Sequence, residues 1–240
     1  MIKLLLVLLK GAKLGKILLS AGTMALSVVA YAWIYGWRYA VGFVGLIFCH
    51  EMGHFAAARI RGLNVGAPTF IPFVGAWIEL KDQPMDAETE AYVASAGPLF
   101  GTVAATVIYL WGREAESGLL LAIAYSGFFL NFFNLIPLSP LDGGRMTAIL
   151  SPRVWFLGVP IMLALMLYRP SPLLILICVA AIPALKQAWH FDKNSEENRA
   201  YYSAPLAMKV EYGAFYLALA GYLALMTEGT HAMIGAVTGN

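Results

Sequence analysis

The chain has 240 residues, of which 60% are hydrophobic and 12% charged, and its formal net charge is +2. A soluble domain is usually about half apolar and about a quarter charged, so this composition excludes an ordinary water-soluble fold. Long apolar blocks cannot all be buried in one aqueous core, and lipid must therefore serve as solvent for much of the surface. The small net charge gives no reason to expect a nucleic-acid partner.

Seven apolar blocks follow one another along the chain, and we expect six or seven of them to be transmembrane helices. They lie at about residues 18–37, 39–60, 91–112, 118–138, 153–168, 170–188 and 208–227. A span needs roughly 20 residues at a rise of about 1.5 Å each. The block at 153–168 is shorter than that. The sequence thus predicts a single polytopic, all-α membrane domain over residues 1–240.

The basic residues indicate the orientation of the spans. If the N-terminus is cytoplasmic and seven spans alternate, thirteen of the 16 lysines and arginines lie on the cytoplasmic side, and only Arg38, Arg113 and Arg169 lie on the other. Cytoplasmic loops carry such an excess of basic residues. The lysines of the first sixteen residues fit a basic amphipathic surface helix that leads into the first span. We therefore expect a multi-pass protein of the cell membrane with its N-terminus in the cytoplasm.

The second block carries the sequence His50-Glu51-Met52-Gly53-His54. On a helix the two histidines lie one turn apart on the same face, about 6 Å between Cβ atoms, so both rings can reach one tetrahedral zinc ion. Glu51 is offset by about 100° around the axis from His50, which suits a base beside a water that the metal activates. The alternative is a polar helix end that faces headgroups. It is disfavoured, because these groups are costly in a membrane unless they pair or bind metal.

A catalytic zinc site usually has three protein ligands, and three side chains are candidates for the third. His190 and His231 lie near the ends of later spans, and Asp142 follows the fourth block in the segment 134–145, NLIPLSPLDGGR. The alternative role for Asp142 is the N-cap of a short helix at 143–150. The predicted topology brings Asp142 and the histidine pair to the same cytoplasmic depth, which favours Asp142 as the ligand.

HEMGH and NLIPLSPLDGG together resemble the motifs of the site-2 protease family of intramembrane zinc metalloproteases, peptidase family M50. The resemblance covers about residues 39–150 as a three-helix catalytic core, with accessory spans in 1–38 and 151–240. It implies one zinc ion per chain, held by His50, His54 and Asp142, with Glu51 as the catalytic base near the cytoplasmic side. It also implies cleavage of a membrane-anchored protein substrate within or near its transmembrane segment, as in regulated intramembrane proteolysis.

Two further places in the family pattern concern the same core. Asn134 stands where the family has an asparagine before the proline-rich segment, which makes it a candidate for binding substrate or stabilising an oxyanion; helix packing or a backbone hydrogen bond is the alternative. Ser95-Ala96-Gly97-Pro98 resembles the family's Ala-Gly-Pro opening of the middle core span. Some relatives have an asparagine three residues after that proline, where this chain has Gly101.

Residues 69–80, TFIPFVGAWIEL, are rich in strand formers but too short to span a membrane and interrupted by Pro72 and Gly75. They predict a β-hairpin that dips into the membrane from the cytoplasmic side. Its edge could pair with an unwound substrate, or the hairpin could simply cover the zinc site.

A competing function is that of a non-proteolytic zinc-binding membrane protein, either a transporter or a chaperone. A transporter is expected to place polar ligands along a crossing path, whereas the polar groups predicted here gather at one depth. The protease is therefore the favoured prediction. Nothing in the sequence indicates an oligomeric state.

Overall fold

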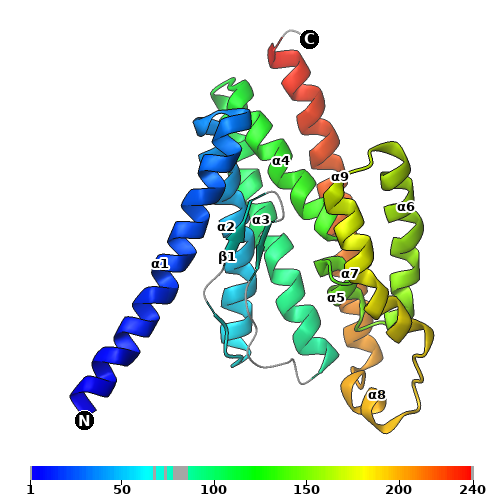
Figure 1. Cartoon of the computed structure of the whole chain (residues 1–240). Helices are drawn as coiled ribbons and strands as arrows, with labels where there is room; N and C mark the ends of the chain where they lie inside the picture. Colours follow the sequence, from blue (N-terminus) through cyan, green and yellow to red (C-terminus); the bar gives the residue numbers. More distant parts are fainter. Residues whose placement is uncertain (1, 67–68, 73–74, 78–85, 239–240) are drawn as a thin grey trace.

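The computed structural model describes residues 2–66, 69–72, 75–77 and 86–238, which form a bundle of helices with one short strand pair (Figure 1). The elements in chain order are α1 (Ile2–Tyr35), α2 (Trp37–Ile60), β1 (Thr69–Ile71), β2 (Gly75–Trp77), α3 (Ala87–Glu114), α4 (Gly118–Asn134), α5 (Asp142–Thr147), a 3₁₀ helix η1 (Pro152–Leu157), α6 (Gly158–Tyr168), α7 (Pro172–Trp189), α8 (Glu196–Tyr201) and α9 (Leu206–Thr238). The predicted predominance of helix is confirmed.

Among the described residues, five helical stretches are long and apolar enough to cross a membrane: Leu18–Tyr35, Trp37–Ile60, Ala87–Glu114, Pro172–Trp189 and Leu206–Val237. Two shorter apolar helical segments, Gly118–Asn134 and Pro152–Tyr168, accompany them. All seven coincide with the predicted blocks, so the chain is a multi-pass membrane protein. The count of six or seven spans stays a prediction. The N-terminal segment continues into the first span as one unbroken helix, α1.

Local sequence signals set the helix ends. Gly36 adopts a φ of +84°, a left-handed conformation that glycine tolerates best, and separates α1 from α2. Asp86 accepts a hydrogen bond from the backbone N–H of Thr89 at 2.6 Å and caps α3. Ser117 and Ser171 cap α4 and α7 in the same way. The helices that hold the core are therefore delimited by their own sequence.

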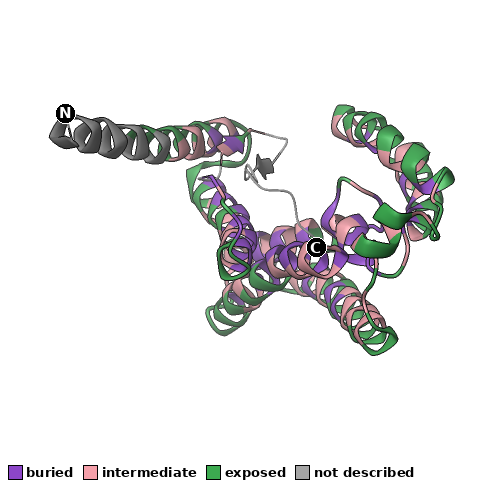
Figure 2. Cartoon of the chain, turned by 90° about the horizontal axis from the view of Figure 1, so that it is seen from below, coloured by how far each residue is buried: buried purple, intermediate pink, exposed green. Residues whose placement is uncertain are grey.

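The central core lies between α2, α3, α4 and α9. Figure 2 shows the buried residues gathered in the middle of the bundle. Buried members of this core come from each of the four helices and from α5: Leu46, Ala94, Ala105, Ile123, Phe128, Met146 and Leu223. At Gly53 of α2 an added Cβ would lie only 2.9 Å from the Cβ of Phe100 in α3. The glycine therefore lets the backbones of α2 and α3 approach each other closely beside the histidine pair.

The strands β1 and β2 are antiparallel and pair Thr69 with Trp77, Phe70 with Ala76 and Ile71 with Gly75. The Phe70 side chain is buried among residues of α1 and α2, and its backbone N–H donates to Oγ1 of Thr23 at 3.1 Å. Residues 73–74 and 78–80 of the predicted hairpin lie outside the described residues. Membrane insertion of the pair and substrate pairing at its edge stay predictions.

One end of the bundle is tied together by polar side chains, and we call it the site end. Arg61 at the end of α2 pairs with Glu88 at the start of α3 at 2.9 Å. Glu90 binds Arg145 of α5 at 3.3 Å and accepts a hydrogen bond from the hydroxyl of Tyr201 in α8 at 2.6 Å. Burial, together with the nearby Glu90 charge, raises the pKa of Tyr201, so its phenol remains a donor at neutral pH.

Candidate metal centre

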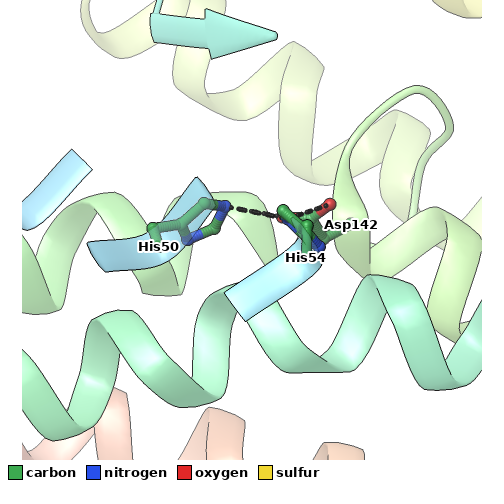
Figure 3. Close-up of side chains that lie close together, drawn as sticks. All are labelled: His50, His54 and Asp142. Carbon is green, nitrogen blue, oxygen red and sulfur yellow. Dashed lines mark hydrogen bonds and ion pairs between the residues drawn. The ribbon is translucent and has the colours of Figure 1, made fainter. Parts of the chain in front are cut away.

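Three buried side chains meet at the site end, two from α2 and one from α5 (Figure 3). Nε2 of His50 lies 3.1 Å from Nε2 of His54 and 3.1 Å from Oδ2 of Asp142. Nε2 of His54 lies 3.2 Å from Oδ1 of Asp142. The two motifs, far apart in the chain, thus converge on one point.

Asp142 is brought to the histidines by the turn that follows α4. It is the first residue of α5, and the capping position belongs to Leu141, so the alternative role of Asp142 as an N-cap is wrong. A Cβ on Gly143 or Gly144 would collide with the backbone of the preceding turn. Trp155 donates its indole N–H to the carbonyl of Gly144 at 2.7 Å. The paired glycines therefore let α5 fold back closely enough to present its carboxylate.

The hydrogen bonds behind the two rings fix which ring nitrogen faces the centre. Nδ2 of Asn131 donates to the Gly127 carbonyl at 2.7 Å, so the Asn131 oxygen must be the atom that faces Nδ1 of His50 at 2.8 Å. Nδ1 of His54 faces the Val93 carbonyl at 2.8 Å. Both partners are acceptors, so each Nδ1 carries a proton, and each ring in its neutral form presents a bare Nε2 toward the centre.

The resulting centre suits a metal cation. The two Nε2 atoms and the carboxylate oxygens of Asp142 lie 3.1–3.2 Å apart, and with neutral rings these acceptors repel one another unless a cation or a proton lies among them. Nitrogen and oxygen ligands at about 2.0–2.2 Å from one tetrahedral zinc ion lie roughly 3.3 Å apart. Among the described residues, His50, His54 and Asp142 form a group that can hold one metal ion.

Two glycines of α3 make room for this arrangement. A Cβ at Gly97 would collide with the imidazole of His54, and a Cβ at Gly101 would collide with the side-chain amide of Asn131. The glycine of the Ala-Gly-Pro motif, which lies inside α3, is therefore a packing requirement of the second histidine. Gly101 serves the first histidine, since it admits the amide that binds the His50 ring.

Glu51 is buried on α2 directly beside the three ligand candidates. The side chains of His50, His54, Asp142 and Arg145 are its titratable neighbours. It is not a member of the group that can hold the metal. A carboxylate in that position is free to interact with a water or substrate at the centre.

The remaining sequence candidates lie elsewhere. His190 is exposed and its Nδ1 is 2.9 Å from the carbonyl of Lys186, while the His231 ring packs against Tyr125 with centroids 5.5 Å apart. Asn134 is half-buried at the end of α4, and in the part of the chain that the structure describes the side-chain bond to His50 comes from Asn131 instead. Asn131 was not among the sequence candidates, although a buried amide one turn before Asn134 was a detectable signal.

The fold and site define a class: a multi-pass helical membrane protein with a buried two-histidine, one-carboxylate metal centre next to a glutamate. Residues 38–118 match the model of Peptidase family M50. The chain is 30% identical over 121 residues to "Zinc metalloprotease MJ0392" of Methanocaldococcus jannaschii, covering 48% of this chain and 34% of that protein. It is also 30% identical over 123 residues to "Putative zinc metalloprotease Rip3" of Mycobacterium tuberculosis, covering 48% and 31%. Residues 38–118 of the chain are thus similar to peptidase family M50.

The matched regions are partial. The chain spans about a third of the length of these relatives. A solved structure titled "Site-2 Protease from Methanocaldococcus jannaschii" aligns with a TM-score of 0.47 and 20% identity, covering 70% of this chain and 87% of that one.

Proposed function

We propose that the chain is a zinc metalloendopeptidase of the site-2 type that cleaves membrane-anchored proteins within or near their transmembrane segments. The observation that carries the proposal is the convergence of two histidine Nε2 atoms and a carboxylate next to the buried Glu51. The relatives named as zinc metalloproteases support the choice of metal and reaction. The match of residues 38–118 to the model of Peptidase family M50 supports this function over that of a non-proteolytic zinc-binding protein.

In this proposal His50, His54 and Asp142 hold one zinc ion, which supplies a Lewis acid that makes a bound water easier to deprotonate. Glu51 accepts the proton of the attacking water, and it returns a proton to the leaving amine when the peptide bond breaks. Asn131 and the Val93 carbonyl keep the two rings in the ligating tautomer. Asn134 stays a candidate for contact with substrate or oxyanion.

The membrane proteome tests the proposed reaction. Cells that carry the wild type should be compared with cells that carry Glu51→Gln, and membrane-anchored proteins that accumulate uncut only in the variant would be substrates. Identical membrane proteomes under conditions in which the wild-type protein is expressed would contradict the proposal.

We expect Asn131→Ala to weaken zinc binding by about 10–100-fold, the usual cost of losing a hydrogen bond behind a ligating histidine. Competition with a chelator of known zinc affinity, on purified protein, measures the change. Asn134→Ala is the matched control, because it removes an amide from the same helix without touching His50, and it should bind zinc as the wild type does. Equal losses in the two variants would contradict this role for Asn131.

We expect the site end to face the cytoplasm, with the N-terminus on the same side. Single cysteines at Glu196 and Glu114, in a background with Cys49 and Cys178 replaced by alanine, test this. Both glutamates are exposed, and Glu114 ends α3, which begins at the site end. In intact cells an impermeant thiol reagent should label the cysteine at 114 and spare the one at 196. The opposite pattern would reverse the orientation.

A further inference from the structure

A cavity lies at the site end, apart from the metal centre. It has a volume of about 630 Å³ and is formed by the segment after α5, the connection between α7 and α8, and the start of α9. Four basic side chains line it, Arg153, Lys193, Arg199 and Lys209, together with one carboxylate, Asp192. Their formal charge of +3 exceeds the +2 of the entire chain.

The single carboxylate belongs to the framework of the cavity. Oδ1 of Asp192 accepts from the backbone N–H of Asn194 at 2.9 Å, and its main-chain carbonyl accepts from Nδ2 of Asn198 at 2.7 Å. These bonds shape the loop between α7 and α8. Asp192 is therefore engaged in holding one wall together.

The basic groups keep their charge available. Arg153 donates to the carbonyl of Phe191 at 3.1 Å and Lys209 to the carbonyl of Tyr202 at 3.3 Å, and these neutral acceptors fix the two side chains without cancelling their charge. Within the described part of the chain, none of the four cations takes part in an ion pair. A cluster of unneutralised cations around a cavity is a binding site for an anion.

The position of the cavity along the spans indicates which anion is within reach. The membrane-length helix α7 ends at Trp189 and α9 begins at Leu206, so the connection between them lies just outside two candidate spans. The Trp189 side chain is exposed, as is usual for a tryptophan at the level of lipid headgroups. We therefore expect the cavity to open at the level of the lipid phosphates.

We propose that this cavity binds the phosphate group of an anionic phospholipid. Arginine matches phosphate oxygens with paired donors and lysine adds point charge, and basic pockets between transmembrane helices bind anionic headgroups. The volume falls in the range of small-molecule sites, about 300–1,000 Å³, and exceeds what a phosphate ion alone would fill. Free phosphate has the same chemistry and is the other possible source. The proposal does not depend on protease activity.

Lipid retention tests the proposal. The purified full chain is incorporated into nanodiscs that contain equal amounts of phosphatidylcholine and phosphatidylglycerol, and the lipids retained after transfer to detergent are counted by native mass spectrometry. We expect the wild type to retain phosphatidylglycerol. The double variant Arg199→Gln/Lys209→Gln should retain at least about tenfold less of it per chain. The charge-conserving Arg199→Lys/Lys209→Arg should keep it, which separates lost charge from misfolding.

Matched controls and a competition arm complete the design. Arg59→Gln/Lys186→Gln removes two exposed basic residues, from α2 and α7, that do not line the cavity; it should retain the lipid as the wild type does. Equal losses in this control and in the cavity variant would overturn the proposal, because general surface charge would then explain retention. Saturable binding of inorganic phosphate at the cavity, without selective lipid retention, would overturn the lipid source in favour of free phosphate.

Discussion

Glu51→Gln should fold, remain in the membrane and keep about one zinc ion per chain, yet its cleavage rate should fall by at least about a hundredfold, the lower range for losing a general base. Glutamine has nearly the same size as glutamate and still accepts a hydrogen bond, but it cannot take a proton near neutral pH. Glu51 lies outside the group that can hold the metal, so the metal should be unaffected. The measurement co-expresses each variant with single-span membrane proteins and follows the cut fragments by gel.

Zinc content distinguishes the possible outcomes of this experiment. Wild-type cleavage by Glu51→Gln, with His54→Ala also active, would show that the protease assignment is wrong. Strong zinc loss in Glu51→Gln would make Glu51 a ligand or a support of the ligands, and the base would then have to be another group.

Removal of a proposed ligand should have the opposite signature, with metal and activity lost together. In His54→Ala or Asp142→Ala the centre retains two ligands of three, and zinc affinity should fall at least about a hundredfold, beyond the cost of losing a supporting hydrogen bond. Elemental analysis of purified protein should give about one zinc per wild-type chain and strong depletion in each variant.

His190→Ala and His231→Ala are the matched controls for the ligand variants. Both residues are exposed histidines of later segments, and neither belongs to the group at the centre; their replacement should leave the zinc content near one. Depletion in His190→Ala with wild-type zinc in Asp142→Ala would reassign the third ligand.

The parts of the site that depend on local spacing could be predicted from the sequence. The four-residue separation of His50 and His54 places them on one helix face whatever surrounds them, and the span pattern determined the depth of Asp142. The helical class followed from apolar blocks in the same way. These features depend on helix periodicity and on the length of a membrane span, and both can be recognised in short stretches of sequence.

Side-chain contacts between helices could not be predicted from local sequence spacing. Asn131, rather than Asn134, binds the ring of His50, because the rotation of α4 against α2 selects one of two amides that lie almost one turn apart. The choice of the Val93 carbonyl for His54 likewise depends on how α3 packs. The number of crossings also stays open, since α4 has only 17 residues and its length alone does not decide whether it spans.

Gly101 and Asn131 occupy one shared space between α3 and α4. A side chain at 101 would take the space that the amide of Asn131 fills from the neighbouring helix. A larger residue at 101 is therefore compatible with this packing only if residue 131 becomes smaller. The two positions constrain each other, so their tolerance to substitution should be measured in double variants rather than one position at a time.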